Sequence, residues 1–238
     1  RFDFKQMLQI LTGILLFYWA LLWLVPKQGP FEIESNFVRT FDILILGESH
    51  LYGGFGIPFD PEGLLSTIPS VGTVIIGYLM GGMLHTTKNY NDCVKRMFVF
   101  GFGLIVIGYL WGFIFPINKA LWTSSYVLFT GGIATILLAI ITYLIDIKHF
   151  KKPFWVFEVF GTNSIFIFIL SGLWVKTIIH IKREVNGEMT SAYNYLYKTI
   201  FVPLAGDLTG SLLFAITHVI GFWLILYWMY RKKIQIKL

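Results

Sequence analysis

The chain has 238 residues, of which 56% are hydrophobic and 13% charged, and its mean hydropathy is +0.70. Soluble domains carry about a quarter charged residues, so this composition excludes a soluble globular class and indicates an integral membrane protein. The formal net charge of +6 does not indicate a nucleic-acid partner, because the basic residues lie at the ends of apolar segments.

Six apolar segments are each long enough to cross about 30 Å of hydrocarbon as a helix. They cover residues 7–25, 64–85, 97–115, 125–146, 154–180 and 208–230. The alternation typical of membrane strands is absent. We therefore expect an all-α, polytopic membrane helix bundle with about six transmembrane helices, forming a single transmembrane domain over residues 1–238.

The lysine and arginine pattern predicts that both ends of the chain face the cytoplasm. In that orientation 12 of the 19 basic residues lie inside, and the run RKKIQIK near the C-terminus is the strongest anchor. The long segment 26–63 then lies outside the membrane, and it carries six acidic residues against two basic ones. The single cysteine, Cys93, excludes an intramolecular disulfide.

The outer segment has predicted structure of its own. Residues 36–46 are apolar with a few charges and predict a short interfacial helix, and the glycine-rich stretch 52–58 predicts a turn. Asp60, Pro61 and Glu62 have the order of an N-cap, a first helical residue and a first-turn acid, so they predict the start of the second span.

The second span has a polar face. Helical spacing places on that face Glu62, Ser66, Ser70, Thr73, Gly77 and Gly81. Pro69 is expected to kink the helix within this face. Two interpretations stay open: a tight helix–helix seam of small residues, or the wall of a cavity entered from outside.

Histidines and deeper polar residues supply further candidates. His50 follows Glu48 in an outer turn, where it could act as a general base that Glu48 orients, although a surface histidine is more often structural. Asn163 lies within the fifth span, where it could line a site or bond to a neighbouring helix. His218 lies deep in the last span and needs a hydrogen-bond partner. No spacing in the sequence matches a metal site.

Four stretches carry a resemblance to a known family. They are LGESHLY with FDPEGLLST (46–52 and 59–67), FPINKALWTSSY (115–126), FGTNS (160–164) and YRKKIQIK (230–237). In order and spacing they resemble the C-terminal half of the heparan-α-glucosaminide N-acetyltransferase family and its bacterial NagX-like relatives. The chain is therefore expected to be the C-terminal portion of a longer transmembrane acyltransferase, in a bacterial inner membrane.

The resemblance implies transfer of an acetyl group from cytosolic acetyl-CoA to an amino sugar or related glycan on the extracytoplasmic side, with no metal. The family's catalytic histidine lies in the N-terminal half, which this chain lacks, so no catalytic residue is assigned here. The expected partners are that missing half, the bilayer and the acceptor glycan. The residues that match the family's motifs are His50, Asp60, Glu62, Asn118, Lys119, Trp122 and Asn163.

Two groups of residues complete the hypothesis. Ser66, Ser70 and Thr73 are expected to line the acceptor-side cavity. Lys88, Lys95 and Arg96 are expected to hold the phosphates of the donor on the cytoplasmic side. Alternative interpretations are a transporter of amino sugars similar to N-acetylglucosamine and a non-catalytic scaffold half. Assembly into a homo-oligomer is left open.

Overall fold

The computed structural model describes residues 2–25, 29–185 and 187–236 of the chain. Helices make up most of this structure, together with one two-stranded hairpin. The chain divides into two compact units, Arg1–Phe150 and Lys151–Leu238. That both belong to a single transmembrane domain stays a prediction.

Five of the described helices are long and apolar enough to cross a membrane, and a bent helix pair brings the number to six if it counts as one span. The predicted all-α membrane class is therefore confirmed. In the first unit the spanning helices are α1 (Phe4–Leu24), α3 (Thr67–Thr86), α4 (Tyr90–Trp111) and α5 (Ser124–Thr142). A single π turn, Tyr143–Ile147, extends α5.

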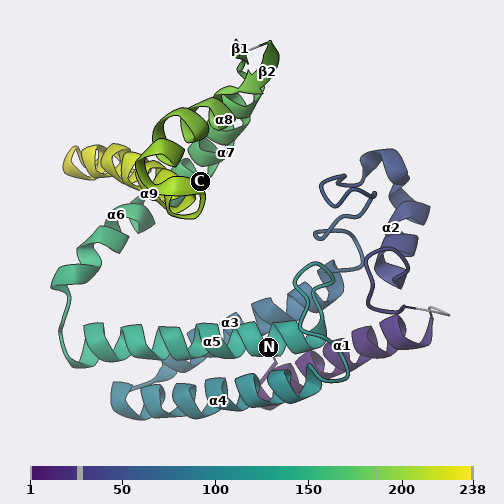
Figure 1. Cartoon of the computed structure of the whole chain (residues 1–238). Coiled ribbons are helices and arrows are strands. Elements are labelled where there is room, and N and C mark those ends of the chain that lie inside the picture. Colours follow the sequence, from purple (N-terminus) through teal and green to yellow (C-terminus); the bar gives the residue numbers. More distant parts are fainter. Residues whose placement is uncertain (1, 26–28, 186, 237–238) are drawn as a thin grey trace. The chain divides into compact units, whose positions relative to one another are not determined.

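Glycines allow α4 and α5 to pack closely, and the two helices run side by side in Figure 1. A Cβ on Gly101 would lie 2.9 Å from the Gly132 carbonyl oxygen, and one on Gly108 would lie 2.9 Å from the Ser125 carbonyl oxygen. Either contact would force the helix backbones apart. On α3, by contrast, a Cβ on Gly77 or Gly81 would meet nothing within 4 Å among the described residues. Gly77 and Gly81, the two glycines of the predicted seam on α3, thus have no close packing partner among the described residues.

At one end of this unit the long loops share an apolar core with the helix ends. Tyr18 and Leu22 of α1 pack with Phe59, Phe115 and Leu121 from the two loops. The predicted interfacial segment forms α2 (Phe37–Leu46), and the Asn36 side chain caps it by accepting from the Arg39 N–H. A short 3₁₀ turn, Glu48–His50, follows it.

The predicted helix start at Asp60 is wrong, since α3 begins only at Thr67. Asp60 Oδ1 does accept a hydrogen bond from the Glu62 N–H, at 2.9 Å, but this closes a local turn. The Gly63 N–H bonds to the Asp60 carbonyl, and the Leu65 N–H is taken by the side chain of Asp42. These bonds hold residues 60–66 in successive turns instead of a helix.

The expected kink at Pro69 is also absent. Because α3 starts at Thr67, Pro69 lies in the first turn of the helix. The first N–H groups of a helix have no carbonyl partner within it, so a proline there removes no hydrogen bond.

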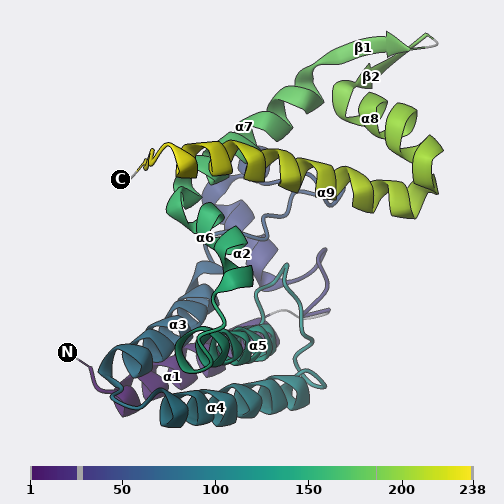
Figure 2. The same ribbon diagram turned by 90° about the vertical axis from the view of Figure 1, so that its left-hand side faces the viewer.

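The second unit contains α6 (Trp155–Thr162), which a 3₁₀ turn (Lys152–Phe154) precedes, and α7 (Ser164–His180). The predicted single span 154–180 is broken at Asn163, where the chain bends by 69°. Strands β1 (Lys182–Val185) and β2 (Glu188–Ser191) then form an antiparallel hairpin. Figure 2 shows the hairpin beyond the end of α7 and ahead of α8 (Ala192–Leu196).

The last long helix, α9 (Val202–Arg231), follows a π turn over Tyr197–Phe201. It contains one break at Gly206, whose φ of 73° lies in the region that favours glycine. Val159 of α6 packs against Leu226 and Met229 of α9, forming the core of this unit. Arg1 and Lys237, which the charge pattern places on the cytoplasmic side, lie outside the described residues.

Candidate functional site

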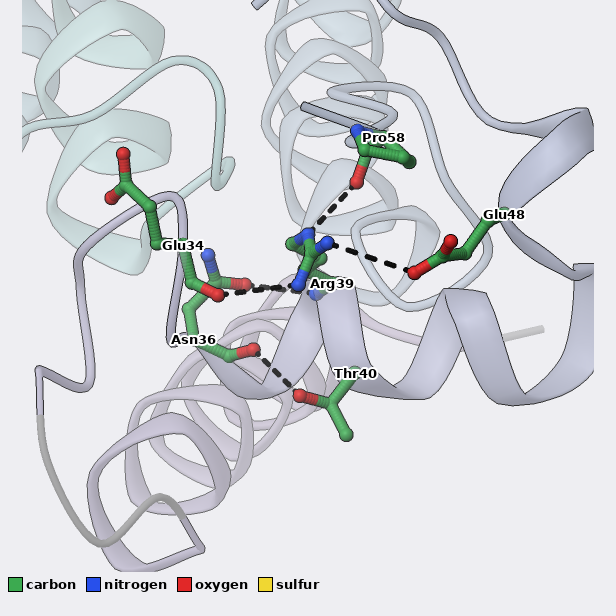
Figure 3. A network of polar contacts seen from close by, with 6 residues as sticks. All are labelled: Glu34, Asn36, Arg39, Thr40, Glu48 and Pro58. Atoms are coloured by element: carbon green, nitrogen blue, oxygen red, sulfur yellow. Dashed lines mark hydrogen bonds and ion pairs between the residues drawn. The ribbon is translucent and has the colours of Figure 1, made fainter. Parts of the chain in front are cut away.

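Arg39 holds together the loop end of the first unit. Its Nε donates to the Pro58 carbonyl at 2.9 Å, and its Nη1 donates to the Glu34 carbonyl at 3.4 Å. Its Nη2 lies 4.0 Å from Glu48 Oε1 (Figure 3). The exposed ion pair adds little stability, whereas the two carbonyl contacts tie α2 to both flanking loops. Glu48 is therefore directed toward Arg39, and the expected orientation of His50 by Glu48 is not seen.

His50 is instead positioned by the backbone of α2. Its Nδ1 lies 2.8 Å from the Leu46 carbonyl oxygen, and Ser49 Oγ is 3.3 Å from the same nitrogen. A carbonyl oxygen can only accept, so Nδ1 carries the hydrogen, and in the neutral imidazole Nε2 then has the lone pair. The exposed ring thus presents a proton acceptor in a fixed tautomer, which is what a general base requires.

Asp42, which the sequence did not mark as a candidate, is the buried acid of this region. Its side chain is 1% exposed, and Oδ1 accepts from the Leu65 N–H at 3.2 Å. Oδ2 has no hydrogen-bond partner among the described residues and lies against Gly63, where a Cβ would collide with it. An aspartate inside the apolar run FVRTFDILIL was the signal that could have identified it.

The environment of Asp42 favours its neutral form. Burial raises the pKa of the Asp42 carboxyl above its usual value, and the nearby Asp60 carboxylate adds to this effect. The N–H groups of Leu65 and Leu64 act in the opposite direction. The Asp42 carboxyl therefore joins α2 to residues 60–66, and burying it there costs more free energy when it is ionised than when it is protonated.

The two serines among the expected cavity hydroxyls bond to nearby backbone carbonyl groups. The buried Ser66 Oγ donates to the Gly63 carbonyl at 2.9 Å, and Ser70 Oγ donates to the Thr67 carbonyl at 2.7 Å. Glu62 is exposed and lies before the helix. The predicted continuous polar face is thus divided between a turn and a helix, and its two serines satisfy local carbonyl groups.

Thr73 and Trp122, two candidates separated by 49 residues, are brought together. Trp122 Nε1 donates to Thr73 Oγ1 at 3.4 Å, and both side chains are half-buried. Trp122 adopts a positive φ of 50°, which is unusual for a bulky residue. Asn118 Oδ1 accepts from the Ala120 N–H at 2.8 Å and so builds the turn that presents Trp122, while Lys119 is exposed.

Basic side chains gather at the opposite end of α3. A pocket of about 330 Å³ lies at the junction of α3 and α4, and Lys88 and Arg96 line it together with Thr87, Asn89 and Asp92. Asn89 caps α4 by accepting from the Asn91 N–H. Lys95 is exposed and does not line this pocket. Two of the three predicted phosphate-binding residues therefore share one pocket.

The Asn163 side chain forms hydrogen bonds with the C-terminal residues of the second unit. Its Nδ2 donates to the Ile234 carbonyl at 3.0 Å, and its Oδ1 accepts from the Ile236 N–H at 2.9 Å. The side chain is 1% exposed. Both polar atoms of the amide are thus used to hold the chain end against the break between α6 and α7. Two of the stretches that carry the family resemblance meet at this point.

Among residues 2–25, 29–185 and 187–236 there is no group of three histidine, cysteine or acidic residues that could hold a metal ion. The site residues at the loop end are hydroxyl, carboxyl, imidazole and indole groups, which can orient and deprotonate a polar substrate. Those at the other end of α3 are suited to an anion.

Comparison with known proteins supports a relationship to one family. Over 146 residues the chain is 32% identical to the heparan-alpha-glucosaminide N-acetyltransferase of Mus musculus and 30% identical to that of Homo sapiens. These alignments cover 54% of the chain but only 22% and 21% of the two relatives, so the chain spans about a fifth of the length of the curated relatives it matches. No protein-family model matches the chain. At this level of identity, the chain is similar to part of a heparan-alpha-glucosaminide N-acetyltransferase.

Proposed function

We propose that the chain is the C-terminal portion of a membrane-embedded acyltransferase that moves an acetyl group from cytosolic acetyl-CoA to an amino sugar or related glycan on the extracytoplasmic side. The similarity to heparan-alpha-glucosaminide N-acetyltransferase is the observation that carries this proposal. The resemblance to NagX-like proteins and the lysine and arginine pattern support a bacterial inner membrane with a cytoplasmic C-terminus.

The geometry of α3 supports a reaction that joins two sides of a membrane. The helix has 20 residues, which is about 30 Å at 1.5 Å per residue, or the thickness of the hydrocarbon core. Ser66, Ser70 and Thr73 lie toward its first residue, whereas Lys88 and Arg96 line the pocket just beyond its last. A donor held at the basic end and an acceptor held at the loop end would thus approach each other along this helix.

Each group has a defined task in the proposed chemistry. Lys88 and Arg96 would neutralise the phosphates of the donor, as charge-assisted hydrogen bonds to phosphate are among the stronger polar contacts. The acceptor nitrogen attacks the thioester carbonyl, the C–S bond breaks, and CoA leaves as the thiolate, which takes up a proton. A base must remove the proton of the amine, and that base is assigned to the part of the protein that precedes this chain. His50, Asp60, Glu62, Asn118, Lys119 and Trp122 would shape the acceptor side.

Isothermal titration of acetyl-CoA into the full-length protein in detergent tests the donor half of this proposal. We expect saturable binding that the Lys88→Ala and Arg96→Gln variants weaken. No heat of binding at millimolar acetyl-CoA, with the protein shown to be folded, would overturn it. Transfer of radiolabelled acetyl groups to glucosamine in proteoliposomes tests the acceptor half.

A transporter of amino sugars is the second candidate, and one observation favours it. Transporters bind their substrates at spanning helices that are broken within the membrane, and the α6–α7 pair is broken at Asn163. The Asn163 amide is nevertheless occupied by the backbone of residues 234 and 236, so the break is filled by the protein's own chain. Uptake of labelled N-acetylglucosamine into proteoliposomes without acetyl-CoA would support the transporter and overturn the enzyme.

A further inference from the structure

A pocket of about 300 Å³ lies between α7 and α9 in the second unit. Leu170 and Trp174 of α7 line it, as do His218, Gly221 and Phe222 of α9. This volume is at the lower end of the range for small-molecule sites, which combine apolar walls with a few placed polar groups. Apart from the imidazole, the walls are mainly hydrocarbon and aromatic rings.

His218 is held in one tautomer by its own helix. Its Nδ1 lies 2.8 Å from the Phe214 carbonyl oxygen, so Nδ1 carries the hydrogen and Nε2 accepts in the neutral ring. Phe214, Trp174 and Phe222 surround the ring, with centroids at 4.4, 6.2 and 6.5 Å from it. Among the hydrogen bonds of the described residues, His218 takes part only through Nδ1.

His218 lies deep within α9, so leaving its Nε2 acceptor without a hydrogen-bond donor costs free energy. It lies 13 residues before Arg231, the last residue of α9, which is about 20 Å along a helix. Water does not satisfy polar groups at that depth, and an unmet hydrogen bond there costs free energy. A ligand that fits must therefore bring a donor, and a neutral one, because a charged group is expensive in the hydrocarbon core.

We propose that this pocket binds a membrane-dissolved long-chain alcohol, with its hydroxyl donating to His218 Nε2 and its hydrocarbon chain against Leu170, Trp174 and Phe222. Thr217 also lines the pocket, but its Oγ1 already donates its hydrogen to the Leu213 carbonyl at 2.8 Å, and a hydroxyl oxygen is a weaker acceptor than an imidazole nitrogen. The proposal needs no acyl transfer, so its failure and that of the proposed function are independent.

Gly221 offers a variant that fills the pocket without disturbing the fold. A Cβ there would meet no described atom within 4 Å, and glycine is a poorer helix former than leucine. Gly172 on α7 is the matched control, since a Cβ there also meets nothing within 4 Å in the described part of the chain and the residue does not line the pocket. His218→Phe keeps an aromatic ring but removes the acceptor.

Photolabelling of the full chain in nanodiscs, using hexadecanol with a mid-chain diazirine, tests the proposal. We expect saturable labelling of α7 and α9 peptides, which Gly221→Leu and His218→Phe each reduce at least fivefold and Gly172→Leu leaves unchanged. The methyl ether of the same probe, which lacks the donor, should label at the level of His218→Phe.

Four results would overturn the proposal. Three of them are equal labelling by alcohol and ether, labelling that Gly221→Leu does not change, and crosslinks between two copies of the chain at α9, which would make the pocket a helix-docking surface. A fatty-acid probe that labels better than the alcohol at neutral pH would also overturn it, because a carboxylate would then be the preferred group. Size-exclusion profiles identical to that of the unchanged protein show that the variants are folded.

Discussion

Asn163 Oδ1 accepts a hydrogen bond from the Ile236 N–H at 2.9 Å, across 73 residues of sequence. The same amide donates from Nδ2 to the Ile234 carbonyl. A single asparagine side chain thus recognises the backbone of residues 234–236 as a neighbouring strand would. This contact joins the break of the α6–α7 pair to the end of α9.

The first prediction concerns this contact. Asn163→Ala should lower the stability of the second unit by about 1–3 kcal/mol, because it removes two hydrogen bonds and leaves a backbone donor and acceptor without partners. The measurement is the thermal unfolding midpoint in detergent, with the rate of tryptic cleavage after Arg231 to Lys233. Ser164→Ala, at the exposed neighbouring residue, is the control. Equal midpoints for the two variants would show that the contact contributes nothing.

The second prediction concerns Asp42. Its carboxyl has a raised pKa in the folded protein, so its contribution to stability is fully present below the unfolded-state pKa, near 3.8, and is lost as the pH rises through the folded-state value. Asp42→Asn should therefore show a smaller loss of stability between pH 4 and pH 7 than the unchanged protein. Unfolding midpoints at the two pH values provide the test, and parallel pH profiles would contradict the assignment.

The third prediction concerns Gly63, which lies against the same carboxyl. Gly63→Ala should destabilise the loop end by about 1–3 kcal/mol, because the added methyl group collides with Asp42 Oδ2. Gly53→Ala is the matched control, since a Cβ there meets none of the described residues within 4 Å. Hydrogen exchange of residues 60–66 reports the effect at the site itself. Unchanged exchange in Gly63→Ala would mean that the two segments are not in contact.

The fourth prediction concerns the basic pocket. Lys88→Ala and Arg96→Gln should each weaken acetyl-CoA binding about tenfold, which corresponds to about 1.4 kcal/mol, because each removes a positive charge from the pocket. Lys95→Ala removes the same charge from an exposed position outside the pocket lining and should change affinity little. A loss of affinity that is equal in all three variants would point to general electrostatic attraction instead of a site.

The fifth prediction concerns His50. His50→Ala should reduce acetyl transfer more than it reduces the yield of folded protein, because the imidazole is exposed and, among the described residues, bonds only through Nδ1. Ser49→Ala, at the adjacent exposed hydroxyl, controls for changes in the turn. If transfer and folded yield fall in parallel in His50→Ala, the histidine is structural.

Hydropathy was enough to predict the spanning helices apart from the break at Asn163, because the length of an apolar run and the cost of burying backbone in lipid depend on local sequence alone. The start of α3 could not be predicted this way. Asp60, Pro61 and Glu62 have a favourable order for a helix start. The Leu65 N–H, however, bonds to the side chain of Asp42, 23 residues earlier, instead of to a carbonyl group of such a helix. Tertiary hydrogen bonding outweighed local preference.

The candidate site could likewise be predicted only where its residues are close in sequence. The sequence grouped Lys88, Lys95 and Arg96 as donor-binding candidates, and the structure puts Lys88 and Arg96 in one pocket that Lys95 does not line. It did not indicate that Asn163 is occupied by residues 234 and 236, or that Trp122 reaches Thr73, because these pairs are distant in sequence. The sequence around a single residue of an apolar helix does not indicate which distant residue it contacts.

The tie between Asn163 and residues 234–236 also sets an order of events during biosynthesis. Translation proceeds from the N-terminus, so α6 and α7 are made and delivered to the bilayer while residue 236 is still to be added. The hydrogen bonds of Asn163 to residues 234 and 236 can therefore form only after about 70 further residues have left the ribosome, including the hairpin and the whole of α9. Until then the Asn163 amide lacks these two backbone partners, so the break between α6 and α7 must form without them.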